Sequence, residues 1–385
     1  MTVDDRTRER LARLALAQSR DVGDLWLAQA VAEVGAVELH DHLRSGRRHS
    51  GTAAKATARL AAVDPARDLE RGERVGLRWV VPGDDEWPSQ LADLVHAEDP
   101  NGTGGPPLGL WARGPLRLDA LARSVAIVGS RSATTYGCDV ASQVAAECAA
   151  EGWTVVSGGA WGIDVAAHRG ALSGGGVTVA VLACGADRAY PVVHERIIDR
   201  IAEDGLVVSE TKPGGAPHKG RFLTRNRLIA GLTRGTVVVE AAIRSGALNS
   251  ATWTTRLSRP LMGVPGPVTS ATSEGVHELV RTGQATLVTS GQDVLEIVGD
   301  VGEHTVVPRR APERPHDRLT ATQRRVLEAV PVRSPAVAGS IAQVAGLGLD
   351  GTLAALHELR AGGLVTTAGH GWLLARQPGE EGAHA

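Results

Sequence analysis

Several residue types are scarce in this chain of 385 residues. It contains one phenylalanine, two tyrosines, two methionines and three cysteines, and only three of its 41 Lys and Arg residues are lysines. The cysteines are Cys138, Cys148 and Cys184, which form no Cys-x-x-Cys pair and have no nearby histidine at ligand spacing. This pattern argues against a zinc site and fits a reducing compartment, so we expect no bound metal.

Missing motifs exclude several classes of enzyme. No lysine in the chain follows a glycine, so the G-x-x-x-x-G-K-[ST] loop of P-loop ATPases cannot be present. The first Val-rich segment is followed by GSRSATTYG and not by G-x-G-x-x-G, which argues against a dinucleotide cofactor. A G-x-S-x-G elbow and an H-E-x-x-H pair are also missing. We therefore expect no cofactor.

Long apolar runs and a strong net charge are missing too. The first residues, MTVDDRTRERLARLALAQ, are too charged for a signal peptide, and no apolar run reaches membrane-spanning length. We therefore expect a cytoplasmic protein without a membrane partner. The formal net charge is -2, so bulk charge cannot hold a nucleic acid and any such binding must be local.

The length of the chain and its hydrophobic content of 43% indicate two or three folded domains. Residues 5–70 include RERLARLALAQ and DLWLAQAVAEVG, whose apolar residues recur at helical spacing and predict a small helical N-terminal domain. Residues 75–300 are expected to form the main domain: the stretch to about residue 123 is irregular and rich in chain breakers, and from about residue 124 to residue 300 short Val- and Ile-rich runs alternate with helix-like segments. This alternation is typical of an α/β fold with a parallel, doubly wound sheet.

The C-terminal part has a different character. Residues 303–318, EHTVVPRRAPERPHDR, are rich in proline and arginine and are interpreted as a linker. Residues 319–377 contain three helix-like segments and a hairpin-like LVTTAGHGWLLA, the order of elements in a winged-helix domain. Its recognition helix would offer only His357 and Arg360 as polar readers, so duplex DNA and protein contact both stay open as roles for this domain.

A basic segment free of acids spans Thr211–Val239. Its cations are Lys212, Lys219, Arg221, Arg225, Arg227 and Arg234, and it also holds Phe222, the single phenylalanine. Such a local charge excess needs an anion, and an aromatic side chain inside it is typical of a nucleic-acid backbone with a base to stack. Because residues i and i+2 of a helix diverge, Arg225 and Arg227 cannot both face a ligand. Which one does stays open, and the other could hold a carboxylate such as Glu240.

Three loops predicted at one edge of the sheet carry small residues suited to an anion. Ligands of open parallel sheets bind past the carboxyl ends of the strands, and free amides at a helix start favour phosphate. The loop residues are Gly129, Ser130 and Arg131; Ser157, Gly158, Gly159 and Gly162; and Arg244, Ser245 and Gly246. We expect these loops and the basic segment to outline one polyanion groove. Asp164 and His168, four residues apart on a helix, are interpreted as structural.

Six segments follow one another along the α/β part of the chain: AIVGSRSATTYG, SGGAWGIDVAAHRGAL, CGADRAYPVVHERIIDRIAEDGLVVSE, RFLTRNRLIAGL, VVVEAAIRSGALNSA and GVPGPV. In their order and spacing, these segments closely resemble the DNA-processing protein A family, also called DprA or Smf. The resemblance covers about residues 80–300. It implies an extended Rossmann-like sheet core flanked by a small helical domain, of SAM or helix-hairpin-helix type, and by a winged-helix domain.

The resemblance also implies a function. Family members bind and protect single-stranded DNA without catalysis, load a RecA-type recombinase onto it in natural transformation or homologous recombination, and form homodimers through the Rossmann domain. The region of the family's dimer contact corresponds to about residues 255–295. Two loops, at Gly129–Arg131 and Gly158–Gly162, would contact DNA. The groove would also contain Lys219, Phe222, Arg225, Asn226 and Arg227, with Phe222 meeting a base.

The chain departs from the family pattern in places. Leu223 stands where the family usually has proline, and the turn Asp21–Asp24 is acidic where a helix-hairpin-helix contact would be basic, which argues against DNA contact there. The main alternative is a Rossmann-type nucleotide-binding enzyme of phosphoribohydrolase type, with a PGG-x-GT-x-x-E loop. Pro213–Gly215 match the start of that loop, but Ala216–His218 do not continue it. A winged-helix transcriptional regulator is the third class, and the poor recognition helix argues against it.

Overall fold

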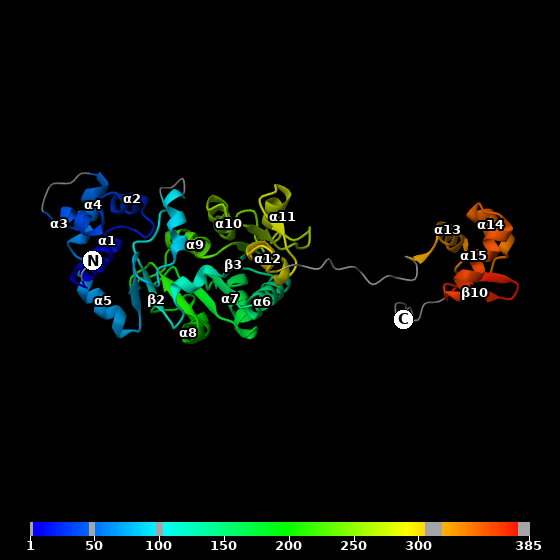
Figure 1. The fold of residues 1–385 in the computed structure, drawn as a ribbon, viewed down its shortest axis with the longest axis horizontal. Coiled ribbons are helices and arrows are strands. Elements are labelled where there is room, and N and C mark those ends of the chain that lie inside the picture. Colours follow the sequence, from blue (N-terminus) through cyan, green and yellow to red (C-terminus); the bar gives the residue numbers. More distant parts are fainter. Residues whose placement is uncertain (1–2, 46–50, 98–102, 305–317, 376–385) are drawn as a thin grey trace. The chain divides into compact units, whose positions relative to one another are not determined.

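The structure is a computed structural model that describes residues 3–45, 51–97, 103–304 and 318–375. It divides the chain into two compact units, Met1–Val306 and Val307–Ala385, both drawn in Figure 1. Most of the linker predicted at 303–318 lies outside the described residues, and the predicted domain boundaries stay predictions.

The N-terminal region of the first unit is helical, as the apolar spacing predicts. Its helices are α1 (Val3–Ser19), α2 (Leu25–Val34), α3 (Ala36–Arg44), α4 (Gly51–Leu60) and α5 (Pro65–Arg74). The carboxylate of Asp24 caps α2 by accepting a hydrogen bond from the Leu27 amide at 3.0 Å. Buried side chains such as Leu16 and Leu43 form a small core between these helices.

The centre of the first unit is a nine-stranded sheet in the order β1-β2-β6-β5-β4-β3-β7-β8-β9. The strands are β1 (Arg78–Val80), β2 (Leu110–Arg113), β3 (Ser124–Val128), β4 (Thr154–Ser157), β5 (Thr178–Val181), β6 (Leu206–Ser209), β7 (Thr236–Val238), β8 (Leu261–Gly263) and β9 (Thr286–Leu287). Pairing is parallel from β6 to β9, and β2 pairs antiparallel with both β6 and β1. The predicted α/β fold with a mostly parallel sheet is confirmed.

Helices cover both faces of the sheet (Figure 1). They and the short 3-10 helices are η1 (Ser89–His96), η2 (Leu118–Ala122), α6 (Thr135–Ala150), α7 (Ile163–Ser173), η3 (Val192–His194), α8 (Glu195–Asp204), α9 (Lys219–Leu232), α10 (Ala247–Arg256), α11 (Glu274–Arg281) and α12 (Gly291–Val298). Along β3, Ala126 and Val128 belong to the core under α9, whereas Val125 and Ile127 belong to the core under α6 and α7. Because both faces are covered, the central strands are continuous apolar runs.

The path of the chain creates a crevice beside β3. The chain runs outward from β3 through β4, β5 and β6, then returns to the other side of β3 as β7. At such a reversal the loops after the two central strands leave in opposite directions and leave room between them. The loops after β3 and β7 are therefore expected to frame a ligand site.

The second unit contains three helices and a hairpin within residues 318–375. They are α13 (Ala321–Ala329), α14 (Ala338–Ala345), α15 (Leu349–Ala361), β10 (Val365–Ala368) and β11 (Gly371–Leu374). Thr320 and Gln323 form a capping box at the start of α13, and the buried Val326, Leu356 and Trp372 belong to one core. These elements follow the predicted order, and the winged-helix assignment stays a prediction.

Candidate nucleic-acid interface

A groove of about 770 Å³ lies at the carboxyl edge of the sheet, where β3 and β7 end. It is lined by loop residues Gly129, Ser130, Arg131, Arg244, Ser245 and Gly246 and by the α9 residues Lys219, Phe222, Arg225 and Asn226. Its charged side chains are four cations, Arg131, Lys219, Arg225 and Arg244, and one carboxylate, that of Asp164. Residues far apart in the sequence thus meet in one hollow with a positive balance of charge, which favours an anionic ligand.

The first loop is clamped between its two neighbours. The Ser130 amide donates a hydrogen bond to the Glu240 carbonyl at 2.7 Å, and the Ser130 carbonyl accepts one from the Ile163 amide at 3.2 Å. Gly162 has a φ of 74°, and a Cβ there would stand 2.3 Å from the Ser130 carbonyl oxygen. Only glycine fits this position, so Gly162 lets the two loops touch and does not itself line the groove.

The Glu240 side chain fixes the start of α6. Its buried carboxylate accepts hydrogen bonds from the Thr134 amide at 2.9 Å and the Thr134 hydroxyl at 2.6 Å, and a third from the Thr272 hydroxyl at 3.2 Å. Thr134 in turn caps α6 through the Gly137 amide. Glu240 therefore orders the groove wall, and the suggestion that it holds an arginine is wrong.

Arg225 lies under the second loop. Its guanidinium donates hydrogen bonds to the Gly158 carbonyl at 2.7 Å and to the Val181 carbonyl, and a Cβ on Gly158 would stand 2.3 Å from Arg225 Nη1. Burial lowers the pKa of Arg225, and the nearby Asp164 carboxylate opposes that effect. Burial likewise raises the pKa of Asp164, against the attraction of Arg225. Arg225 thus both supports the loop and adds positive charge to the groove wall.

The other second-loop residues shape the groove from below. Ser157 is buried and its hydroxyl donates to the Ile127 carbonyl at 2.7 Å, so this side chain does not reach the groove, contrary to its predicted placement. Gly159 is buried with a φ of 68°, and its carbonyl lies 3.0 Å from Nδ1 of His194. Ser157 at the end of β4 and Gly159 after it fix the path of the loop.

Arg227 lies away from the groove, and its predicted place in the groove is wrong. Its side chain is fully buried, and two guanidinium nitrogens donate to the two oxygens of Glu210 at 2.8 Å each. A third donates to the Gly105 carbonyl at 3.1 Å. The divergence of positions i and i+2 on α9 explains the outcome: Arg225 faces the groove, and Arg227 ties α9 to the end of β6.

Aromatic side chains line one end of the groove. The Arg131 guanidinium carbon lies 4.6 Å from the Phe222 ring centroid, and the Tyr190 and Phe222 centroids are 5.7 Å apart at a tilt of 48°. A smaller hollow of about 180 Å³ continues from here and is lined in part by Trp161, Tyr190 and Val192. Trp161 and Tyr190 are about half exposed. Sequence reasoning missed both, although aromatic residues in glycine- and proline-containing loops of an aromatic-poor chain are a usable signal.

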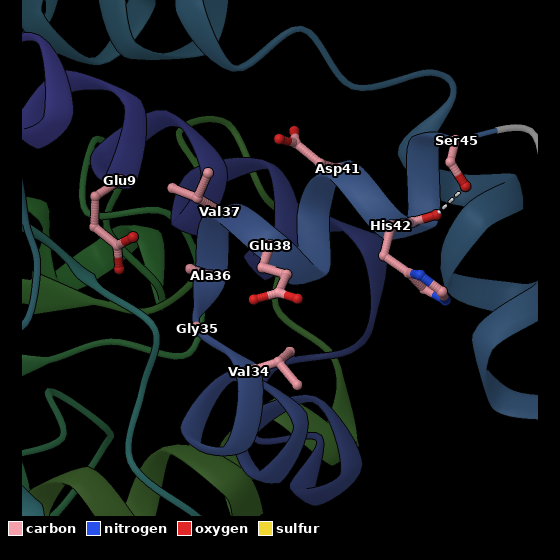
Figure 2. Close-up of a pocket in the computed structure, with 9 residues that line it drawn as sticks. All are labelled: Glu9, Val34, Gly35, Ala36, Val37, Glu38, Asp41, His42 and Ser45. Atoms are coloured by element: carbon pink, nitrogen blue, oxygen red, sulfur yellow. Dashed lines mark hydrogen bonds between the residues drawn. The ribbon is translucent and has the colours of Figure 1, made fainter.

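A second surface hollow has the opposite character. Figure 2 shows Glu9, Glu38 and Asp41 around a hollow of about 540 Å³ formed by α1 and α3. Asp41 pairs with Arg8 at 2.6 Å, and its pKa is lowered first by a hydrogen bond with His40 and then by Arg8. This acidic lining would repel a polyanion.

Within the described residues, no group of His, Cys, Asp and Glu could hold a metal ion and no helix is long and apolar enough to cross a membrane.

His168 is a buried neutral base behind the second loop. Its Nδ1 lies 2.8 Å from the Thr178 hydroxyl, whose proton goes to the Val155 carbonyl, so Nδ1 carries the hydrogen. Its Nε2 has no hydrogen-bond partner among the described residues. Burial, together with the nearby Arg225 and His194, lowers the pKa of His168 to about 3. The imidazole therefore stays neutral in the folded protein at ordinary pH.

We predict an acid-dependent loss of stability that originates at His168. In the unfolded chain this histidine has a pKa of about 6.5 and takes up a proton below that value, whereas the folded protein does not until about pH 3. The contribution is complete above about pH 6.5 and falls as the pH drops towards 3. Urea unfolding at several pH values gives the free energy of unfolding as a function of pH. The slope of this free energy against pH should be smaller for His168→Gln than for the wild type. Asp164 contributes with the opposite sign in both proteins, so equal slopes would contradict this assignment.

The fold and the groove define a Rossmann-like α/β protein with a positively charged groove at the reversal point of its sheet. The family model for DNA recombination-mediator protein A matches residues 78–299. The chain belongs to this family, also known as DprA or Smf, which confirms the family resemblance seen in the sequence. It is 44% identical over 353 residues to a DNA processing protein DprA of Mycobacterium tuberculosis, covering 91% of this chain and 90% of that protein.

Two other comparisons concern DNA processing proteins of different bacteria. The crystal structure of DprA from Streptococcus pneumoniae superposes with a TM-score of 0.61 and 34% identity, covering 73% of this chain and 95% of the other. A structure of the Helicobacter pylori protein, described in terms of its single-stranded DNA binding mode, gives a TM-score of 0.50 at 30% identity and covers 57% of this chain and 95% of the other. These likenesses agree with the observed sheet and helical N-terminal region.

Proposed function

We propose that this chain binds single-stranded DNA in the groove between the ends of β3 and β7 and acts as a non-enzymatic recombination mediator. The observation that carries the proposal is the meeting of four cations, one carboxylate and an aromatic cluster in a single hollow. A basic channel with stacking side chains is the general design of single-strand binding sites.

The groove offers distinct partners for the two parts of a DNA strand. Arg131, Lys219 and Arg244 are exposed and can meet phosphates, Arg131 and Arg244 with a planar fork of donors. Lys219 also begins α9, where free backbone amides favour an anion. Phe222 and Tyr190 present ring surfaces to a base. Stacking on a side chain requires an unpaired base, so this arrangement favours a single strand over a duplex.

The family relationship supports a wider role for the bound strand. In this proposal the protein protects the strand, forms a homodimer through the Rossmann-like domain and loads a RecA-type recombinase. Sedimentation at several concentrations tests the dimer. The loading is tested on single strands already coated with a single-strand binding protein. DNA-dependent ATP hydrolysis by a RecA-type recombinase is measured on these strands with and without this chain. No stimulation of that hydrolysis would leave only the binding function.

The alternative enzyme is less well supported by the groove. Of the residues that line it, only Asp164 carries a carboxylate, and that group is buried and 3.3 Å from the Ala160 amide. The lining thus lacks the pair of carboxylates that acid-base hydrolysis often uses, and its one imidazole is that of the exposed His218. Incubation with nucleoside monophosphates, followed by chromatography, tests the alternative: release of a free base would overturn the non-enzymatic proposal.

We predict that binding depends on salt and on two groove cations. Arg131→Ala and Lys219→Ala should each weaken binding to all sequences alike and reduce the slope of log K against log salt by about 1, because each removes one phosphate contact. Gel shifts with single strands and duplexes at several salt concentrations measure this. Arg200→Ala is the matched control, since Arg200 is exposed on α8 and paired with Glu203. Equal or tighter duplex binding, or no effect of both groove variants, would contradict the proposal.

A further inference from the structure

Two cations of the basic segment, Lys212 and Arg221, share a second hollow outside the groove. Lys212 and Arg221 line a separate hollow of about 250 Å³ between the end of α1 and the loop from β6 to α9. Trp79 and Trp111, which pack with centroids 5.1 Å apart, form part of its wall. The loop from β6 to α9 thus contributes residues to both hollows, since Pro217 of that loop lines the groove.

The hollow has more cations than carboxylates in its lining. Its two carboxylates already have partners: Asp21 pairs with Arg59 at 3.1 Å, and Glu210 with Arg227 at 2.8 Å. A third cation of the wall, Arg20, pairs with Asp24 at 2.6 Å.

Lys212 and Arg221 bind only neutral groups in the described part of the chain. Lys212 Nζ donates to Gln18 Oε1 at 3.1 Å, and Arg221 Nη1 donates to the Ala216 carbonyl at 2.6 Å. Two cations without a carboxylate beside one small hollow attract an anion.

Two side chains that line this hollow, Trp79 and Arg221, each carry a buried nitrogen donor without an acceptor. Nε1 of Trp79 and Nε of Arg221 have no hydrogen-bond partner among the described residues, and Trp79 is only 1% exposed. A buried donor without an acceptor costs free energy, so such groups point to a missing partner. A phosphate group supplies several acceptor oxygens and negative charge at once.

We propose that this hollow is a second phosphate site, held by Lys212 and Arg221. The phosphate is either free, as a phosphate ion or a mononucleotide, or a phosphodiester of the strand in the groove. The second source rests on the proposed function: a strand that passes over the loop from β6 to α9 reaches Lys212 after leaving the groove. The acidic turn Asp21–Asp24 does not prevent this, because both of its carboxylates are paired.

The indole resonance of Trp79 provides a direct test. Uniformly ¹⁵N-labelled full-length chain, with this resonance assigned through Trp79→Phe, is titrated with inorganic phosphate, with dTMP and with short and long dT oligomers. We expect the Trp79 resonance to shift with at least one probe in the wild type and not in the double variant K212Q/R221Q. The control R200Q removes an exposed cation of α8 and should behave as the wild type, and matching urea midpoints show that the variants are folded.

The probes separate the two sources and the two proposals. If the strand is the source, long oligomers shift the resonance, and the double variant binds them several-fold to about tenfold more weakly while a short oligomer binds unchanged. If free phosphate is the source, phosphate or dTMP alone produces the shift, even should the chain fail to bind single strands at all. The site is disproved if no probe shifts the Trp79 resonance while long oligomers still bind to the chain.

Discussion

Replacing Arg227 by alanine is expected to lower the free energy of unfolding by about 3–5 kcal/mol, the usual cost of removing one partner from a buried ion pair. The substitution removes both hydrogen-bond donors of the Glu210 carboxylate and leaves it unpaired, although its side chain is only 11% exposed. It also removes the donor to the Gly105 carbonyl and opens space beside Gly23, whose Cβ position would lie 3.4 Å from the guanidinium carbon.

Urea unfolding monitored by circular dichroism measures this loss. The matched double variant Arg227→Met with Glu210→Leu should recover much of the stability, because replacing both charges by apolar groups leaves no unpaired charge. Arg200→Ala, on an exposed ion pair of α8, should change stability little. An Arg227→Ala protein that unfolds at the wild-type midpoint would show that the Glu210 pair does not hold α9 to β6.

The parallel sheet could be predicted because each central strand is recognisable from its own residues alone. In β3, β4 and β7 every residue is buried, so each strand is a short Val-rich run bounded by small residues. The loops that follow were predictable for the same reason, since the position of a loop follows from the strand before it. The edge strand β1 and its neighbour β2 lie in an irregular part of the sequence and were not predicted.

The partner of each buried charge could not be predicted. Glu210 and Glu240 both follow strands of the same sheet and have similar neighbours in sequence, yet Glu210 pairs with Arg227 and Glu240 holds Thr134, the residue that caps α6. The choice depends on strand order, which places β6 and β7 on opposite sides of β3. Spacing on α9 could say only that Arg225 and Arg227 diverge.

Whether a given side chain is buried or reaches the groove also could not be predicted from the sequence. Ser157 reads as a loop residue suited to phosphate, but it is the last residue of β4 and its hydroxyl is used by the Ile127 carbonyl. The reverse holds for Tyr190, which was not assigned to the site from the sequence but lines the groove and packs against Phe222.

Replacing Phe222 by alanine is expected to weaken single-strand binding by about 1–3 kcal/mol, the range found for a side chain that stacks on a base. Fluorescence anisotropy with a labelled dT oligomer measures the change. Phe222→Tyr should retain most of the affinity because it keeps the ring. Leu223→Ala is the control for apolar area, since Leu223 is the neighbouring groove residue and is 42% exposed.

The contact between Arg131 and Phe222 makes this substitution informative about mechanism. In the free protein the guanidinium lies over the ring at 4.6 Å, where a stacking base would compete with it. A base that takes this place releases Arg131 towards a phosphate, so the two side chains act on the strand together. The double variant Arg131→Ala with Phe222→Ala should then lose less affinity than the two single losses added, whereas additive losses would place the base on the ring face that Arg131 does not cover.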